Sequence, residues 1–143
     1  MIDSSPQPTR VLVVEDSLDD QEFLYRQLRK TPLGENVLFV SDPRKALDLL
    51  QNEDGPRFRQ ELVVIFLDIH LPFMSGLDLL RIIRETEGMK DFPVIIMTAL
   101  PTPETIAACT ELKARAFVEK PVTFSHFSKV IADLFHSPME ALV

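Results

Sequence analysis

The stretch that decides the fold runs from Val63 to Pro72 and reads VVIFLDIHLP. Its first five residues are all apolar, which is typical of a β-strand buried on both faces. The run then ends on a carboxylic acid, Asp68, and a proline follows closely. An acid at the end of a buried strand needs an explanation from the rest of the chain.

Length and composition limit the possible classes of protein. The chain has 143 residues, of which 45% are apolar and 26% charged, as expected for one globular domain with its own core. The longest apolar run, Leu62 to Leu67, is too short to span a membrane, and residues 1–10 are too polar for a signal sequence. We therefore expect a soluble protein without a membrane partner.

Cysteine content and charge narrow the setting further. The single cysteine, Cys109, cannot form an internal disulfide, which fits a reducing cytoplasm. It has no metal-ligand spacing with the three histidines, so we interpret it as an ordinary helix residue. The net charge of −7 disfavours binding to DNA phosphates or to anionic lipid. The expected partners are proteins or small molecules rather than nucleic acid.

Strand-like and helix-like segments alternate along the chain. The predicted strands cover residues 11–14, 36–40, 63–67, 94–97 and 116–118. Capping residues indicate helix starts near Ser17, Asp42-Pro43, Ser75 and Thr102-Pro103, and a last helix contains Phe124 and Phe127. The polar segment Gln51 to Gln60, which includes Gly55-Pro56, is predicted to be a connecting loop.

Five strands alternating with five helices predict a doubly wound α/β fold, in which helices cover both faces of a parallel five-stranded sheet. We expect this domain to cover residues 10–135, with a flexible tail at 1–9 and a second tail at 136–143. In such folds the ligand site lies beyond the carboxyl ends of the strands.

Polar residues stand at the carboxyl ends of four predicted strands. They are Glu15-Asp16, Asp68, Thr98-Ala99 and Glu119-Lys120-Pro121. Each of them alone fits an ordinary cap or turn. Because the carboxyl ends of parallel strands meet at one edge of a sheet, we expect all four groups to line one pocket.

The residue types in this pocket favour phosphoryl chemistry. Two carboxylates about 4 Å apart repel each other by roughly 4 kcal/mol at an effective dielectric constant near 20, so Glu15, Asp16 and Asp68 call for protonation or a cation. An oxygen-only cluster suits Mg²⁺. Lys120 adds a positive charge and Thr98 a hydroxyl donor for a phosphoryl group. Asp68, the lone acid at the end of the most apolar strand, is the candidate nucleophile that would form an aspartyl phosphate.

Four segments of the chain resemble the receiver domain of bacterial response regulators. They are VLVVEDS at 11–17, FLDIHLPFMSGLDLL at 66–80, VIIMTA at 94–99 and FVEKP at 117–121. They stand in the family's order with suitable spacing, and the resemblance covers roughly residues 10 to 135. It implies the flavodoxin-like strand order 2-1-3-4-5.

The resemblance also implies a role in a two-component phosphorelay. A sensor histidine kinase would donate a phosphoryl group to Asp68, with Mg²⁺ held by Glu15, Asp16, Asp68 and the backbone carbonyl of His70. The protein would catalyse only its own phosphorylation and dephosphorylation, so it is not an enzyme in the ordinary sense.

The same resemblance implies a conformational switch. Thr98 and Phe117 match the threonine and the aromatic residue that move together on phosphorylation, and the fourth helix, fifth strand and fifth helix form the implied output surface. The Lys120-Pro121 peptide matches one that is usually cis in the family.

The chain departs from the family pattern at a few positions. Lys113 stands where receivers commonly have a glycine shortly before the fifth strand, which implies a different local turn. Pro101 and Pro103 stiffen the loop after Thr98. His70 occupies a position that tunes hydrolysis in the family, although it also fits an ordinary loop histidine.

Three other readings compete with a phosphorylated receiver. A dehalogenase-type phosphatase would place a second acid where this chain has His70, and a flavodoxin-like carrier would need a phosphate loop where Glu15-Asp16 would repel the phosphate. A receiver-like module could also work without phosphorylation, which the complete set of site residues argues against.

The sequence shows no output domain after residue 135. We therefore expect a stand-alone receiver that signals by protein contact, by forming a homodimer, or by relaying the phosphoryl group. The long loop before the third strand and the C-terminal tail resemble those of small regulators paired with bacterial phytochromes, which makes a phytochrome a candidate kinase.

Overall fold

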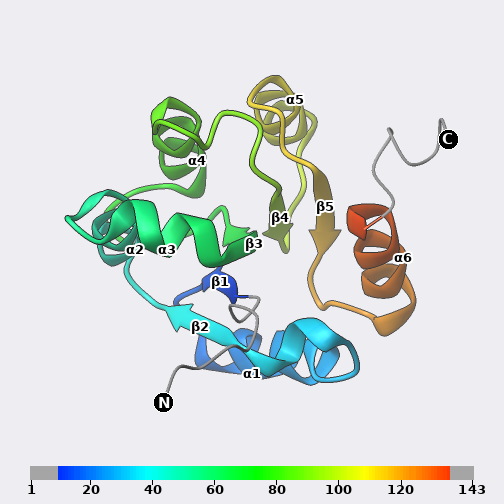
Figure 1. The fold of residues 1–143 in the computed structure, drawn as a ribbon. Coiled ribbons are helices and arrows are strands. Elements are labelled where there is room, and N and C mark those ends of the chain that lie inside the picture. Colours follow the sequence, from blue (N-terminus) through cyan, green and yellow to red (C-terminus); the bar gives the residue numbers. More distant parts are fainter. Residues whose placement is uncertain (1–9, 136–143) are drawn as a thin grey trace, which may run out of the picture.

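The computed structural model describes residues 10–135, and its centre is a five-stranded parallel sheet (Figure 1). The strands are β1 (Arg10–Val14), β2 (Val37–Val40), β3 (Leu62–Asp68), β4 (Val94–Thr98) and β5 (Ala116–Glu119). Their order in the sheet is β2-β1-β3-β4-β5, which confirms the predicted doubly wound topology. The predicted tails, 1–9 and 136–143, lie outside the described residues.

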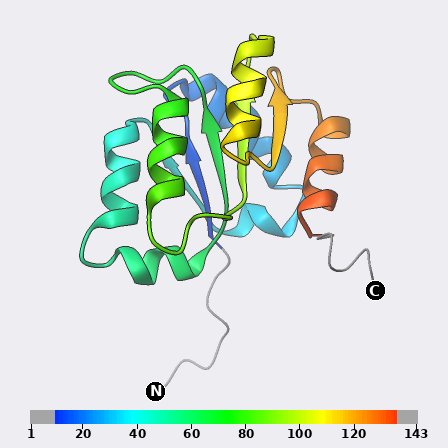
Figure 2. The same cartoon turned by 90° about the horizontal axis from the view of Figure 1, so that it is seen from above.

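Helices cover both faces of this sheet, as predicted. They are α1 (Leu18–Leu28), α2 (Pro43–Gln51), α3 (Gly55–Glu61), α4 (Gly76–Glu85), α5 (Pro103–Glu111) and α6 (Phe124–Phe135), with a 3-10 turn, η1 (Pro32–Glu35). Helices α2 to α5 lie on one face, and α1 and α6 lie on the other (Figures 1 and 2).

Each central strand contributes to two hydrophobic cores because successive side chains point to opposite faces. In β3, Ile65 and Leu67 pack toward α2 and α4, whereas Val64 and Phe66 pack toward α1 and α6. The ring of Phe66 stacks on that of Phe127 from α6, with centroids 5.9 Å apart. Both faces of β3 are therefore buried, which explains its uninterrupted apolar sequence.

The predicted helix starts at the four capping residues are confirmed. Ser17, Asp42, Ser75 and Thr102 each have an extended backbone and accept a hydrogen bond from a backbone N–H in the first helical turn. These bonds satisfy donors that would otherwise lack a partner at the start of a helix. They fix where each helix leaves the carboxyl edge of the sheet.

The predicted loop from Gln51 to Gln60 is wrong, because its second half forms α3. Pro56 stands in the first helical turn, where the missing N–H has no partner to lose. A side chain at Gly55 would lie 2.5 Å from the carbonyl oxygen of Leu50, so the two helices approach too closely for any other residue. Phe58 anchors α3 in the core and lies under the guanidinium of Arg10, 5.2 Å from the ring centroid.

The turn before β5 keeps a left-handed residue although it has no glycine there. Lys113 adopts a φ of 63° directly after α5. The guanidinium of Arg84 stabilises this turn by donating to the carbonyls of Leu112 at 2.8 Å and Lys113 at 2.9 Å. Lys113 therefore takes a backbone conformation that glycine favours, although it carries a side chain.

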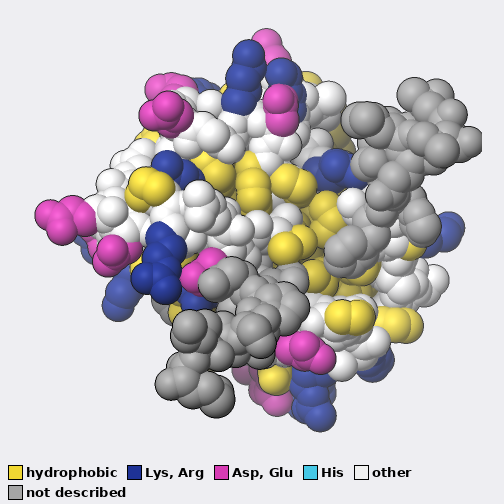
Figure 3. Space-filling view, in the orientation of Figure 1, with side chains coloured by type: hydrophobic (Ala, Val, Ile, Leu, Met, Phe, Trp, Pro, Cys, Tyr) yellow, Lys and Arg dark blue, Asp and Glu magenta, His cyan; other side chains and the backbone are white. Residues whose placement is uncertain are grey.

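Figure 3, drawn in the orientation of Figure 1, shows hydrophobic side chains gathered around β4 and β5, with charged side chains mostly toward the outline. Among the described residues, no helix is long and apolar enough to cross a bilayer.

Candidate functional site

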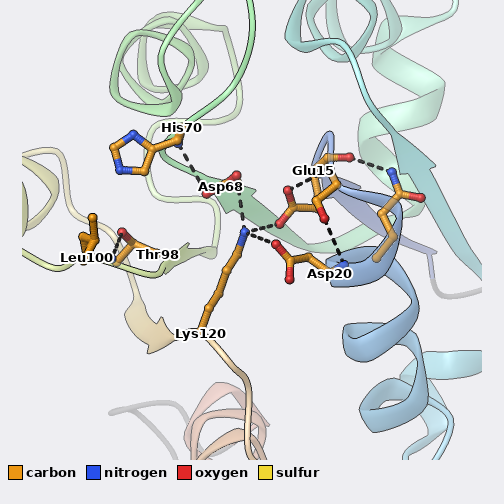
Figure 4. A network of polar contacts seen from close by, with 9 residues as sticks. Glu15, Asp20, Asp68, His70, Thr98, Leu100 and Lys120 are labelled. Atoms are coloured by element: carbon orange, nitrogen blue, oxygen red, sulfur yellow. Dashed lines mark hydrogen bonds and ion pairs between the residues drawn. The ribbon is translucent and has the colours of Figure 1, made fainter.

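The predicted site residues meet at the carboxyl edge of the sheet (Figure 4). Glu15 follows β1, Asp68 and Thr98 end β3 and β4, and Lys120 follows β5. Parallel strands place these four positions side by side because they all run in the same direction. The contacts described below bring the side chains of Glu15, Asp68 and Lys120 together at this edge.

Lys120 is the centre of the polar network. Its ammonium group donates a hydrogen bond to Glu15, lies 2.9 Å from Asp20 Oδ2 and lies 3.4 Å from Asp68 Oδ2. Its side chain is only 12% exposed, so these contacts replace most of its hydration. The backbone N–H of Lys120 donates to the Thr98 carbonyl at 2.9 Å, and the Lys120-Pro121 peptide is cis, as the family resemblance implies.

Glu15 is a buried acid in contact with that lysine. Burial raises the pKa of Glu15 to about 7, with a further contribution from the Asp68 charge, while hydrogen bonds from Lys120 and the Ser17 N–H work in the opposite direction. Burial alone would lower the pKa of Lys120, but its bonds to Glu15 and Asp20 outweigh that effect and raise it to about 12. Lys120 is therefore a permanent cation at neutral pH.

Asp68 is held from two sides. Its Oδ1 accepts a hydrogen bond from the His70 N–H at 3.3 Å, and its Oδ2 faces Lys120. The start of α4 presses against its backbone, because a side chain at Gly76 would lie 2.1 Å from the Asp68 carbonyl oxygen. Asp68 is only 4% exposed, so its carboxylate is largely shielded from solvent.

Thr98 ends β4, the strand next to β3, and Phe117 lies on β5, the strand beyond it. Thr98 is fully buried, and its hydroxyl accepts a hydrogen bond from the Leu100 N–H at 3.2 Å. Leu100 itself is 72% exposed. Phe117 is half-buried and packs against the core beneath α4 and α5. A single hydrogen bond thus connects the buried Thr98 hydroxyl to the exposed residue Leu100.

Asp20 belongs to the site, although from the sequence alone it is only an acidic residue in the first turn of a helix. Its backbone N–H donates to the cap residue Ser17 at 3.2 Å, and its carboxylate reaches Lys120. The signal was its position three residues after the cap, which directs the side chain back toward the strand end. Recognising this requires knowing that Lys120 lies opposite, 100 residues away.

The loop between β3 and α4, residues 69–75, carries His70 and has an unusual tip. Phe73 has a φ of 69° and is 73% exposed. The left-handed region costs a residue with a bulky side chain about 1–2 kcal/mol. The guanidinium carbon of Arg44 lies 3.7 Å from the centre of the Phe73 ring, and Arg44 Nη2 lies 2.7 Å from Asp42 Oδ2.

The acidic cluster can hold a metal ion. Glu15, Asp16 and Asp68 each offer a carboxylate oxygen, and these oxygens lie within 4.8 Å of one another. Glu15 and Asp68 are buried and Asp16 is exposed, so the cluster opens toward solvent on one side. Three oxygen donors of this kind suit a hard divalent cation that keeps some of its water ligands.

The fold and the site together define a class: a doubly wound α/β protein with an acidic cluster and a lysine at its carboxyl edge. A family model described as the response regulator receiver domain matches residues 11–132. The chain belongs to the family of response regulator receiver domains.

Individual relatives agree with this assignment. The chain is 36% identical over 127 residues to the sensory/regulatory protein RpfC of Xanthomonas campestris pv. campestris, covering 87% of this chain but only 16% of RpfC. It is 32% identical over 125 residues to the two-component response regulator ORR3 of Oryza sativa subsp. indica, covering 87% of this chain and 88% of ORR3.

Solved structures include a similar protein described as the bacteriophytochrome response regulator RtBRR. It is 35% identical, with a TM-score of 0.76, over 89% of this chain and 78% of that one. The family resemblance expected from the sequence is therefore confirmed, including its likeness to bacteriophytochrome regulators.

Proposed function

We propose that this receiver accepts a phosphoryl group from a sensor histidine kinase on Asp68, in a reaction that depends on Mg²⁺. One observation carries the proposal: the Asp68 carboxylate lies between the Lys120 ammonium group and the His70 N–H, at the open edge of the sheet. This arrangement holds a nucleophile in place beside a fixed positive charge, which phosphoryl transfer requires above all.

The chemical step is a direct displacement at phosphorus. One carboxylate oxygen of Asp68 attacks the phosphorus, a P–O bond forms, and the P–N bond to the kinase histidine breaks. The electron pair of that bond remains on the imidazole nitrogen. Lys120 lies 3.4 Å from Asp68 Oδ2 and is cationic, so it can pair with an oxygen of the transferred group.

The residues that would hold Mg²⁺ are Glu15, Asp16, Asp68 and the His70 carbonyl. Their fit rests on the clustered carboxylate oxygens described above. When bound, the ion neutralises charge on the phosphoryl oxygens. Glu15 is kept in position by the Ser17 N–H, which donates to its Oε2 at 3.2 Å.

Phosphorylation would then change the surface formed by α5, β5 and α6. The Thr98 hydroxyl now accepts a hydrogen bond from the Leu100 N–H, and it can donate one to a phosphoryl oxygen. Forming that new bond would move the hydroxyl relative to the Leu100 N–H. Phe117 lies on the neighbouring strand and would adjust to that movement. The signal would pass to a downstream protein through this surface, with residues 10–135 acting as the receiver unit.

The kinase proposed for this receiver is of the phytochrome type. The likeness to the bacteriophytochrome response regulator RtBRR supports this choice, because it extends over most of both chains at 35% identity. Phosphotransfer from a purified phytochrome kinase, compared with a kinase of another input class, tests the choice. Equal transfer rates from the two kinases would count against it.

The acceptor assignment can be tested with the isolated protein. After incubation with Mg²⁺ and acetyl phosphate, intact mass should show one added phosphoryl group. Asp68→Asn should abolish the addition, whereas Asp78→Asn, an exposed acid on α4, should leave it unchanged. Absence of any adduct, or an adduct that survives Asp68→Asn, would favour a receiver-like module that works without phosphorylation at this residue.

A further inference from the structure

The loop between β3 and α4 is closed at its base and strained at its tip. The N–H of Gly76 donates to the Ile69 carbonyl at 2.8 Å, which joins the two ends of the loop. Near the tip, the N–H of Met74 donates to the Pro72 carbonyl at 2.7 Å, around the left-handed Phe73. The bulky side chain at this position disfavours the conformation, so other contacts must maintain it.

Burial does not maintain it. Phe73 is 73% exposed, and it is one of the most exposed large hydrophobic residues among the described residues. Its clear stabilising contact is the stack on Arg44, whose guanidinium carbon lies 3.7 Å from the ring centre. Attraction between a cation and the face of an aromatic ring favours this geometry.

Arg44 is itself held in one orientation. Its Nε donates to Asp42 Oδ1 at 3.1 Å and Oδ2 at 3.2 Å, and its Nη2 donates to Asp42 Oδ2 at 2.7 Å. Asp42 is the cap of α2 and also accepts from the Arg44 N–H. The planar guanidinium is therefore fixed to the start of α2, and the loop reaches across to that point in Figure 2.

We propose that Arg44 and Phe73 are positioning residues that hold the loop carrying His70 in its site-forming conformation. The stack anchors the tip of the loop to α2, while the Gly76 bond anchors its base. His70 lies between the two anchors, and its N–H already contacts Asp68. The inference rests on the proposed function, because it treats the His70 carbonyl as part of the metal site.

The first test measures the loop in metal-free protein, with no phosphodonor. Amide hydrogen exchange at Met74 and Gly76 should become at least several-fold faster in Arg44→Ala and in Phe73→Asn, because asparagine accepts the left-handed backbone but lacks the ring. Phe73→Tyr keeps the stack on Arg44, so its amide exchange should stay as slow as in the wild type. Arg81→Ala removes another exposed arginine-aspartate pair, at 3.0 Å from Asp78, and should leave the loop unchanged.

The second test measures Mg²⁺ binding by titration calorimetry. Arg44→Ala and Phe73→Asn should each weaken Mg²⁺ binding by about tenfold, as loss of a group that orients metal ligands does. The double variant should show no further loss, because both changes break one contact. Unchanged exchange and affinity in both single variants would overturn the proposal, and so would an equal loss in Phe73→Tyr.

These outcomes remain distinct from failure of the proposed function. Loop exchange and Mg²⁺ affinity do not require that Asp68 accept a phosphoryl group. Their outcome is therefore independent of the intact-mass test of Asp68 phosphorylation. If the variants changed only the rate of transfer from a kinase, Phe73 would be a partner contact and the positioning role would be wrong.

Discussion

Lys120 donates a hydrogen bond to the buried carboxylate of Glu15, although the two residues are 105 positions apart in the chain. The contact joins the loop after the first strand to the loop after the last strand of the chain. It also places a permanent cation among acids that would otherwise repel one another. We expect the stability of the site and its pH dependence to follow from the contact between Lys120 and Glu15.

Replacing Lys120 should destabilise the protein in a pH-dependent manner. Lys120→Met leaves Glu15 and Asp68 buried without their cation, which we expect to lower the free energy of unfolding at pH 8 by about 3 kcal/mol. Because the pKa of Glu15 is raised to about 7, Glu15 is protonated at pH 5, and the loss should be smaller there.

Urea unfolding in the presence of a chelator, at pH 8 and pH 5, measures both values for Lys120→Met. Lys129→Met removes an exposed lysine of α6 and serves as the matched control, with little effect at either pH. Equal losses at the two pH values for Lys120→Met would contradict the assigned role of Glu15.

The contact between Gly76 and the backbone of Asp68 should tolerate no side chain. An added Cβ would lie 2.1 Å from the Asp68 carbonyl oxygen, so Gly76→Ala should lower the free energy of unfolding by about 3 kcal/mol. Gly88→Ala is the matched control: Gly88 has a φ of 81° but open space around it, so only backbone strain of about 1 kcal/mol is expected. Chemical denaturation compares them, and equal losses would show that close packing at Gly76 is unimportant.

Cys109 should be unreactive in the folded protein and should destabilise it at high pH. Burial raises the pKa of its thiol to about 11, above the ordinary value of 9.0. The folded state therefore retains a proton that the unfolded state releases, and stability falls by about 1.4 kcal/mol per pH unit as pH rises from 9 toward 11.

The control for this prediction is Cys109→Ala, which should show a shallower loss of stability over the same pH range. A thiol reagent at pH 8 should label the native wild-type protein slowly and the unfolded protein rapidly. Rapid labelling under native conditions would contradict the buried, protonated state of this thiol.

Thr98 should separate phosphorylation from the response to it. Thr98→Ala keeps Asp68 and Lys120, so we expect an adduct to form with acetyl phosphate, while the amide NMR shift changes across Ala116–Glu119 become smaller. Thr98→Ser keeps the hydroxyl and should respond like the wild type. Full shift changes in Thr98→Ala would remove Thr98 from the proposed switch.

The positions of the strands along the chain could be predicted because each of them carries a local signal, whereas their order in the sheet was implied by the family resemblance. Fully buried strands such as β3 are continuously apolar, and caps such as Ser17 and Ser75 mark the following helices. The carboxyl-edge residues followed from topology alone, since parallel strands end at the same edge. No long-range information was needed for these steps.

Features that depend on packing between distant segments could not be predicted in the same way. Gly55-Pro56 has the composition of a turn, and only the approach of α3 to Leu50 shows why a helix begins there. The role of Asp20 depends on Lys120. The left-handed backbone at Lys113 depends on Arg84, whose bonds to the surrounding carbonyls lie outside any local pattern.

The parallel topology also has a practical use in measurement. β1 begins at the amino edge of the sheet and α6 runs back from the carboxyl edge, so the start of β1 and the end of α6 both lie on the side remote from Asp68 (Figure 2). A sensor chip or a fluorescent reporter attached on this side of the domain would leave the acidic cluster free for binding. Binding of metal, phosphodonor and kinase could therefore be followed on immobilised protein without obstruction of Asp68.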